Sequence, residues 1–532
     1  MAEHDDAERW DYVIVGSGFG GSVSALRLVE KGYRVLMLEQ GRRLGPADFP
    51  RSNWQLRRWL WMPALGMRGL FRMTFLRHVT ALSGVGVGGG SLVYANTLPI
   101  PSDSFFGAAS WAHLADWKTE LAPHYATARR MLGAAENPYV TPADEVIREL
   151  ARDIGRPDQV HPATVAVYFG KPGVTAPDPY FDGRGPERTG CIQCGGCMLG
   201  CRFGAKNTLD KNYLHLAEQQ GLVLRADSRV EGIELAGDGG YVVRVRERKG
   251  RGRYQVRADR VILSGGVLGT VDLLLRMRAR GGGLPGLSAR VGHFVRTNSE
   301  VLMGVVSRRR DVDMSRGIAI GSILHTDEAS HIEPVRYPAG SGFFRTMMAP
   351  HAPGPNGFVR LARAFGFAVR HPWRSLQTWF VPDWAKFTMI LLYMRTLEGH
   401  ISLRLGRPLR RLFRRGMTTE LADGPRPTAA IPEATELGLR VAEKIDGYPT
   451  SMLTETLFGV PTTAHILGGC VMADSPDSGV IDHRHEVFGY PGLYVIDGSA
   501  VSANPGVNPS LTITAMAERA MTFIPPKPGS GG

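Results

Sequence analysis

The chain opens with a short β-branched run, then glycines, then a longer apolar segment. Residues 11–15, Asp-Tyr-Val-Ile-Val, have the character of a buried parallel strand. The apolar residues that follow the glycines, up to Lys31, have helical spacing, and residues 34–39 return to strand character. This order predicts a strand, turn, helix and second strand, the opening unit of a parallel α/β sheet.

The turn of this unit carries Gly16, Gly18 and Gly21. At this spacing, glycines provide a tight turn, a close approach to a pyrophosphate, and close contact between strand and helix. The helix begins beneath the turn, so its free N–H groups face the phosphates. Glu39 closes the second strand, where its carboxylate can accept hydrogen bonds from the ribose hydroxyls. We therefore expect an adenine dinucleotide, and the motif alone leaves NAD and FAD open.

Later segments repeat or vary this pattern. A second glycine-rich run covers residues 84–96, where bare backbone can approach a flat cofactor. Residues 261–263 resemble the first strand and precede a glycine turn and a helix that contains residues 272–277. Further helices are predicted at 116–132, 141–154 and 208–219, and a small antiparallel sheet from residues 222–224, 230–233, 241–245 and 254–256.

The alternation typical of antiparallel strands dominates the later middle of the chain, for example at 318–324 and 388–393. A strand at 494–497 and a helix at 509–521 then return to the first type of pattern. We expect an α/β fold in which a Rossmann-like cofactor domain is assembled from discontinuous segments and covered by a substrate-binding domain with a mainly antiparallel sheet. The predicted division is 1–297 for the cofactor domain, with a cysteine-rich loop at 190–202, then 298–460 for the substrate domain, 461–524 for the return, and 525–532 for a disordered tail.

Length and charge refine this picture. The 532 residues exceed what one core usually holds, and the net charge is +13. The excess of arginine lies in residues 51–77 and 360–415, where it is interleaved with large apolar residues. Such segments favour peripheral contact with an anionic lipid surface, or amphipathic elements with a buried side, over nucleic-acid binding. The residues that carry the pattern are Trp54, Arg57, Arg58, Trp59, Trp61, Met62, Arg68, Trp373 and Trp379.

No run of 18 uncharged apolar residues is present, so a spanning helix is not expected. The first dozen residues carry several acids and lead directly into the first strand, which leaves no space for a secretory signal. We therefore expect a cytoplasmic protein, peripheral at the membrane at most.

Two C-terminal stretches place polar side chains beside rigid turns. His465 precedes Gly468 and Gly469, and Asn508 precedes Pro509 at the start of a helix. A histidine can accept a proton near neutral pH while an asparagine holds the same hydroxyl. The N–H groups at the start of that helix could face the side of a flavin where negative charge develops. The pair suits alcohol oxidation.

These motifs together resemble the glucose-methanol-choline (GMC) oxidoreductase family, and most closely its cholesterol-oxidase-like branch. The resemblance implies FAD, a lid-like substrate domain, and hydride transfer from an alcohol carbon to flavin N5. It implies that His465 and Asn508 are the catalytic residues. It places the contacts with FAD at Gly16, Gly18, Phe19, Gly20, Gly21, Glu39, Gly88, Gly89, Gly90, Ser91, Asn96, Val230, Asp497, Gly498, Asn508 and Pro509.

The chain departs from that branch at one position. The resemblance places a glutamate that isomerises the steroid double bond just before residues 388–394, and this sequence has Phe387 there. Asp383 is the nearest upstream acid, and Glu333 is a more distant one. The departure speaks against isomerase activity and against cholesterol itself as the substrate.

Cys191, Cys194, Cys197 and Cys201 form a C-x2-C-x2-C-x3-C run like that of bacterial ferredoxins. A [4Fe-4S] cluster, a zinc ion and a metal-free loop all remain open as interpretations. A cluster would favour an external electron-transfer partner, and dioxygen is the other candidate acceptor. Cys470, beside His465, is expected to be a packing residue.

The function that these observations predict is FAD-dependent oxidation of the alcohol group of a hydrophobic, sterol-like substrate. One alternative is a dehydrogenase of non-steroid alcohols or of ring C–C bonds that uses an external electron carrier. Another is an inactive flavoprotein that binds lipid or membrane.

Overall fold

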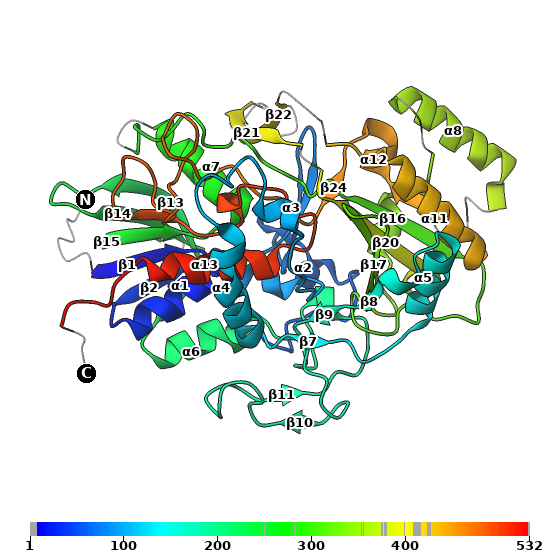
Figure 1. Cartoon of the computed structure of the whole chain (residues 1–532), viewed down its shortest axis with the longest axis horizontal. Helices are drawn as coiled ribbons and strands as arrows, with labels where there is room; N and C mark the ends of the chain where they lie inside the picture. Colours follow the sequence, from blue (N-terminus) through cyan, green and yellow to red (C-terminus); the bar gives the residue numbers. More distant parts are fainter. Residues whose placement is uncertain are drawn as a thin grey trace.

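In the computed structural model, the chain is organised around two seven-stranded sheets (Figure 1). The structure describes residues 8–248, 252–280, 283–352, 354, 356–373, 376, 380–397, 399–407, 416–422 and 427–529. None of the helices within these ranges combines the length and apolar character that a membrane crossing requires.

The first sheet has the order β12-β2-β1-β15-β14-β13, and β25 pairs with β15. β12, β2, β1, β15 and β25 are parallel neighbours, whereas β13 and β14 continue the sheet in antiparallel fashion. All four residues of β2 are buried, as expected for a parallel strand that is covered on both faces. The strands are β1 (Arg9–Val15), β2 (Val35–Leu38), β12 (Val223–Arg225), β13 (Ser228–Leu235), β14 (Tyr241–Glu247), β15 (Arg253–Leu263) and β25 (Leu493–Val495).

The pairing of β25 with β15 brings the end of the chain back to its beginning. Val261–Leu263 lies between Val13–Val15 on one side and Leu493–Val495 on the other. The helices that pack against this body come equally from distant segments: α1 (Phe19–Glu30), α4 (Trp117–Met131), α6 (Tyr213–Gln219), α7 (Gly266–Arg278) and α13 (Ser510–Thr522). The predicted Rossmann-like fold assembled from discontinuous segments is therefore confirmed.

The small antiparallel sheet predicted around residues 222–256 is not a separate sheet. β12 is a parallel edge strand beside β2, and β13 and β14 extend the main sheet. The reason lies in β15, which spans eleven residues. Its more polar first half pairs with β14, and its apolar end, Val261–Leu263, pairs with β1 and β25.

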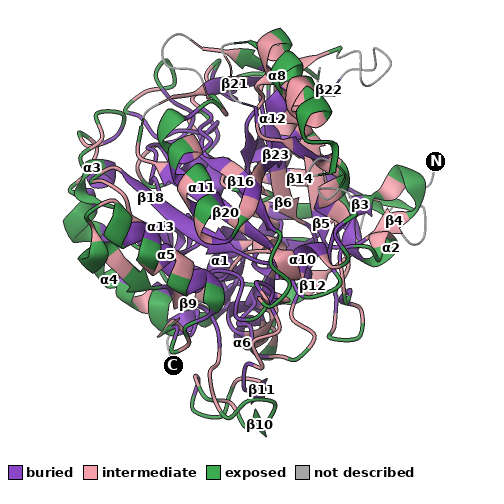
Figure 2. Cartoon of the chain, turned by 90° about the vertical axis from the view of Figure 1, so that its right-hand side faces the viewer, coloured by how far each residue is buried: buried purple, intermediate pink, exposed green. Residues whose placement is uncertain are grey.

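The second sheet is antiparallel throughout, with the order β19-β23-β16-β20-β18-β17-β8. Helices α5 (Pro142–Asp153) and α11 (Pro432–Lys444) cover one face, and the strands between them are buried (Figure 2). The strands are β8 (Val160–Pro162), β16 (Val301–Ser307), β17 (Ser322–His325), β18 (Ser330–Val335), β19 (Met348–Pro350), β20 (Thr388–Arg395) and β23 (Gly447–Met452).

The two bodies exchange segments across the predicted division at residues 297 and 298. α5 and β8, from the first segment, belong to the second sheet. The hairpin of β21 (Ile401–Gly406) and β22 (Gly416–Leu421) packs instead on α7 of the first body. These four elements therefore cross the predicted boundary, and the division into domains remains a prediction.

The predicted helices at 116–132 and 141–154 are confirmed as α4 and α5. Asp116 caps α4 by accepting a hydrogen bond from Thr119 N–H at 3.3 Å, and Thr141 with Asp144 forms a capping box on α5. The helix predicted at 208–219 is shorter, because Asn212 has non-helical dihedrals and α6 begins only after it. The strand predicted at 318–324 is formed only at Ser322–His325.

The tail at 525–532 was predicted to be disordered, but Pro525 and Lys527 make contacts with the first sheet and its helix connection. Tyr33 donates a hydrogen bond to Pro525 O, and the Lys527 ammonium lies 2.7 Å from the Asp11 carboxylate. The remaining helices and strands are α2 (Leu56–Trp59), β3 (Trp61–Met62), β4 (Met67–Arg68), β5 (Phe71–Phe75), β6 (Thr80–Gly84), α3 (Asp103–Phe106), β7 (Ala135–Glu136), β9 (Thr164–Val165), β10 (Thr175–Ala176), β11 (Arg188–Thr189), α8 (Gly357–Arg370), α10 (Trp384–Phe387), α12 (Leu453–Phe458) and β24 (Thr462–Thr463).

The two basic and aromatic segments differ in burial. In the first segment, Trp59 belongs to a hydrophobic cluster and stacks on Phe71, and Trp61 is also buried, whereas Trp54 is exposed. α8, in the second segment, has no buried residue. Trp379 and residues 408–415 lie outside the described part of the chain.

Candidate active site

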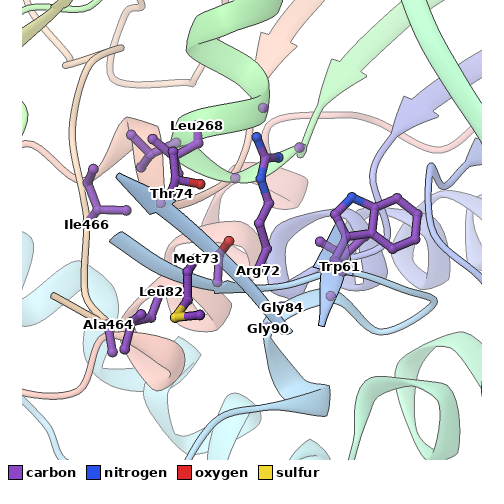
Figure 3. Close-up of a pocket in the computed structure, with 18 of the residues that line it drawn as sticks. Trp61, Arg72, Met73, Thr74, Leu82, Gly84, Gly90, Leu268, Ala464 and Ile466 are labelled. Carbon is purple, nitrogen blue, oxygen red and sulfur yellow. The ribbon is translucent and has the colours of Figure 1, made fainter. Parts of the chain in front are cut away.

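A cavity of about 1880 Å3 is bordered by both bodies. Its walls combine the glycine turn of the first sheet with apolar side chains from the second sheet and from the β5–β6 hairpin. Figure 3 shows Met73 and Leu82 of this hairpin beside Ala464, with Ile466 and Leu268 further along the wall. The volume of the cavity exceeds the roughly 300–1,000 Å3 of ordinary ligand pockets, so a large cofactor and a substrate can both be accommodated.

The glycine turn after β1 is shaped by two different constraints. A Cβ on Gly16 would stand 2.3 Å from Ser264 O, and one on Gly20 would stand 1.8 Å from Ile496 O. Packing therefore requires glycine at both positions. Gly18 is different, since the nearest atom to such a Cβ is 3.8 Å away and the residue borders the cavity. Its bare backbone leaves room for a pyrophosphate.

The second glycine run lies against this turn. A Cβ on Gly89 would approach Gly18 Cα to 2.7 Å, and Gly89 and Gly90 border the cavity. The structure thus brings together most of the residues predicted to bind FAD. Those that border the cavity are Gly16, Gly18, Phe19, Gly20, Glu39, Gly89, Gly90, Val230, Asp497, Gly498, Asn508 and Pro509.

Four predicted cofactor residues do not border the cavity. Gly21 packs the helix on the strand, because a Cβ there would stand 2.2 Å from Gly16 O. Gly88 has a positive φ of 101°, and its carbonyl accepts a hydrogen bond from Ser91 Oγ at 2.7 Å. Asn96 is fully buried, also with a positive φ. These residues shape the loop behind the cavity wall.

Two buried carboxylates hold the turns together. Glu39 accepts hydrogen bonds from Ser17 N–H, Ser17 Oγ and Gly41 N–H. Asp497 accepts hydrogen bonds from Ser499, from Thr270 Oγ1 at 2.6 Å, and from Gly266 N–H. Burial raises the pKa of both carboxyl groups, and the donors around them partly oppose it. With Gly18 open to the cavity, these residues fit an adenine dinucleotide.

His465 and Asn508 meet at the wall of the cavity. His465 Nε2 lies 3.5 Å from Asn508 Nδ2, and Asn508 Nδ2 lies 3.4 Å from Glu333 Oε2. On the other side of the imidazole ring, His465 Nδ1 lies 2.5 Å from Glu300 Oε2. Nδ1–H therefore donates to Glu300, which leaves the Nε2 lone pair of the neutral ring beside Asn508.

Glu300 was not predicted from the sequence. It lies just before β16, its side chain is fully buried, and its second oxygen accepts a hydrogen bond from Ala464 N–H. Burial lowers the pKa of His465, but the Glu300 carboxylate outweighs this effect, and the net pKa is raised. No motif surrounds Glu300, so only its long-range contacts with Ala464 and His465 identify it.

The structure corrects our interpretation of the acids near the site. Phe387 packs in a hydrophobic cluster beneath the Arg310 guanidinium, and Asp383 caps α10. Glu333, which sequence spacing made the more distant candidate, is fully buried on β18 beside Asn508. The antiparallel pairing of β18 with β20 carries Glu333 to the site, a consequence of register that spacing does not reveal.

The four clustered cysteines border a second cavity of only about 20 Å3. That is room for about one water molecule. Burial raises the pKa of the Cys191 thiol to about 12 and that of Cys194 to about 11, which opposes the thiolates that metals require. Within the described ranges, no three His, Cys, Asp or Glu side chains are placed to hold a metal ion. The residues as arranged do not fit the candidate [4Fe-4S] cluster or zinc.

Comparison with known proteins agrees with this geometry. Residues 186–279 and 417–517 match the GMC oxidoreductase family, and residues 14–57 match the NAD(P)-binding Rossmann-like domain. The pyridoxine 4-oxidase structure from Mesorbium loti superimposes with a TM-score of 0.62 at 17% identity and covers 97% of this chain and 99% of that one. This likeness concerns the fold.

Two curated relatives are much closer in sequence. The chain is 46% identical to a cholesterol oxidase of Mycobacterium tuberculosis, over 97% of this chain and 91% of the relative. It is 43% identical to a cholesterol oxidase of Acinetobacter baumannii, over 97% and 95% of the two chains. The chain therefore belongs to the GMC oxidoreductase family, in its cholesterol-oxidase-like branch, and is an FAD-dependent oxidoreductase that acts on CH–OH donors.

Proposed function

We propose that this enzyme oxidises the secondary alcohol of a hydrophobic, sterol-like substrate. The observation that carries the proposal is the position of His465 and Asn508 in a cavity with two kinds of wall. One wall is the glycine turn around Gly18, and the other consists of apolar side chains, including Met73, Val335, Phe344, Ile390 and Leu392. The names of the two cholesterol oxidases quoted above support a sterol, and the word oxidase in both supports dioxygen as acceptor.

In this proposal, His465 accepts the hydroxyl proton and Asn508 orients the hydroxyl oxygen. The tautomer fixed by Glu300 gives Nε2 the free lone pair that this step needs. Asn508 Nδ2 carries two N–H donors and lies 3.5 Å from His465 Nε2, so it can donate a hydrogen bond to the hydroxyl oxygen while the hydroxyl proton passes to His465. FAD, when bound, supplies the hydride acceptor.

Glu333 is the group best placed to move a proton on the steroid ring. It is the buried carboxylate beside Asn508, and Asn508 borders the cavity. In the family resemblance a glutamate isomerises the double bond, and Phe387 had argued against that activity. The position of Glu333 instead favours isomerisation as a second step on the same substrate.

An anaerobic absorbance spectrum of the purified holoenzyme tests the proposal. Addition of a 3-hydroxysterol should bleach the flavin bands, and His465→Gln should slow this bleaching by about 10²- to 10⁴-fold. Terpenoid and long-chain alcohols form the matched panel. Equal bleaching by those alcohols would contradict the sterol, and no bleaching by any alcohol would favour a flavoprotein that only binds lipid.

We also propose that α8 rests on a lipid surface that supplies the substrate. Phe358, Leu361, Phe365 and Val369 recur at helical spacing, and each is at least 50% exposed. α8 packs on α12, whose Phe458 both borders the cavity and is 67% exposed. Arg363 and Arg370 lie among these apolar residues and favour anionic lipid. Figure 1 shows α8 at the edge of the molecule.

A further inference from the structure

Three histidines lie on neighbouring strands behind the active site. In the second sheet, β18, β17 and β8 are adjacent, with His331 opposite His325, and with His161 opposite Ile323. Because side chains alternate along a strand, these three histidines and Glu333 project from the same face of the sheet. The four side chains therefore form a row that leads away from Asn508.

The row is continuous from the active site to the surface. Glu333 Oε2 lies 3.4 Å from Asn508 Nδ2, and Glu333 Oε1 lies 3.4 Å from His331 Nε2. The ring centroids of His331 and His325 are 5.7 Å apart, and those of His325 and His161 are 6.0 Å apart. Glu333 and His331 are buried, His325 is half-buried, and His161 is exposed.

Packing alone does not explain this row. Glu333 Oε1 and His331 Nε2 are buried, and neither has a well-aligned hydrogen-bond partner among the described residues. Burying such groups without well-aligned hydrogen bonds destabilises the folded protein. Burial is the main cause that lowers the pKa of His325, followed by repulsion from His331 and His161, with Arg156 adding to it. A neutral imidazole of this kind accepts a proton only transiently, as a carrier must.

We propose that Glu333, His331, His325 and His161 form a path that exchanges protons between the active site and solvent. The inference rests on the proposed function, in which oxidation of an alcohol leaves one proton on His465 at the wall of the cavity. That proton passes from His465 Nε2 to the Glu333 carboxylate through one solvent molecule beside Asn508, which itself carries no proton. Glu333–H returns to carboxylate as His331 is protonated. His331, His325 and His161 then pass one proton outward in turn, directly or through one solvent molecule. No electron moves along this row.

The path is tested by anaerobic stopped-flow mixing of holoenzyme and a 3-hydroxysterol in weakly buffered solution with a pH indicator. His331→Gln keeps a hydrogen-bonding side chain but cannot carry the proton. We expect flavin bleaching at close to the wild-type rate and proton release slowed by about a hundredfold. His351→Gln is the matched control, since His351 is also shielded and hydrogen-bonded but lies away from the row. It should release the proton like the wild type.

His161→Ala separates a proton path from a structural effect. Because His161 is exposed, added imidazole should restore proton release in this variant but not in His331→Gln. Proton release at the wild-type rate in His331→Gln would overturn the proposal. If no sterol bleaches the flavin, the proposed function fails on its own. In that case the bound flavin is reduced photochemically, and the same indicator follows proton uptake. The rates of proton uptake are then compared among the same variants.

Discussion

Glu300 holds His465 by a single contact of 2.5 Å between the Glu300 Oε2 and His465 Nδ1 atoms, and both side chains are almost entirely buried. The contact fixes the tautomer of the ring and raises its pKa against the effect of burial. Two other carboxylates act in the same region, since Glu333 also raises the pKa of His465 and Glu455 lies near Glu300. The charge of the site is therefore set by its carboxylates.

The variant Glu300→Gln should lower the pKa of His465, because the carboxylate that favours the imidazolium is removed. His465 accepts the proton only when neutral, so wild-type activity should rise as the pH rises through the raised pKa. In Glu300→Gln this limb should move to lower pH, and kcat should fall by about 10²- to 10⁴-fold as the ring loses its orientation. The pH profile of kcat/KM and an NMR titration of the ring measure both effects.

A matched control is Glu518→Gln, which removes a buried carboxylate that pairs with Arg27 far from the site. Its acidic limb should stay in place, and an unchanged limb in Glu300→Gln would contradict the assignment. The stability contribution has a defined sign. A folded pKa above the unfolded one stabilises the protein fully below the unfolded pKa of histidine, and this contribution is lost as the pH rises through the raised folded value.

The variant Gly18→Ala should fold and yet bind less FAD. A Cβ at this position finds no atom within 3.7 Å, and its φ of −74° suits alanine, but the methyl group enters the space beside the turn. The ratio of flavin to protein absorbance should fall while the thermal transition of the apoprotein stays unchanged. Gly20→Ala should instead prevent folding, since its Cβ would stand 1.8 Å from Ile496 O. Full flavin content in Gly18→Ala would refute the assignment of the turn.

Local patterns predicted the elements that depend on local chemistry. The turn at Gly16–Gly21 and the helices predicted at 116–132 and 141–154 follow from residues that are close in sequence. The positions of Glu300 and Glu333 in the site could not be predicted from their neighbours in sequence, because strand pairing brings them to His465 and Asn508. Phe387, which the family resemblance placed at the site, packs against a hydrophobic cluster instead.

Burial was the second property that the sequence left open. The tryptophans at 54–61 and the apolar residues of α8 are both interleaved with arginines. Trp59 and Trp61 nevertheless lie in the core, and Phe358 and Phe365 lie outside it. An amphipathic pattern fixes which residues share a face, but the position of the whole element decides whether that face meets protein.

The variant Glu333→Gln should separate two reactions of a Δ5-sterol. Oxidation of the alcohol should continue, because His465 and Asn508 are retained. Isomerisation should be lost, because an amide cannot carry the proton, and the unconjugated ketone should accumulate when products are resolved by chromatography. Asp383→Asn is the control, since that carboxylate caps α10. Conjugated product from Glu333→Gln at the wild-type rate would exclude Glu333 from this role.

Purified protein should contain no stoichiometric iron or acid-labile sulfide. The cavity among the four cysteines is small, and Lys206, whose burial lowers its pKa to about 7, donates beside it to the carbonyls of Leu92, Tyr94 and Cys197. We therefore expect Cys197→Ser to leave the spectrum of the holoenzyme unchanged and to lower stability modestly. Elemental analysis of protein kept under argon checks this, and four iron atoms per chain would refute it.

The double variant Phe358→Glu/Phe365→Glu should abolish binding of α8 to anionic vesicles. Both rings are more than two-thirds exposed, so the substitutions bury no charge and the thermal transition should not change. On vesicles that contain phosphatidylserine, the wild type should sediment with lipid and the variant should stay in solution, whereas neither should bind zwitterionic vesicles strongly. Leu439→Glu is the matched control, because Leu439 is 48% exposed on α11, a helix that packs on α5, β16 and β23. Activity on detergent-dispersed sterol should be equal in all three proteins, since the cavity is intact. Equal sedimentation of the wild type and the double variant would show that α8 does not carry the contact.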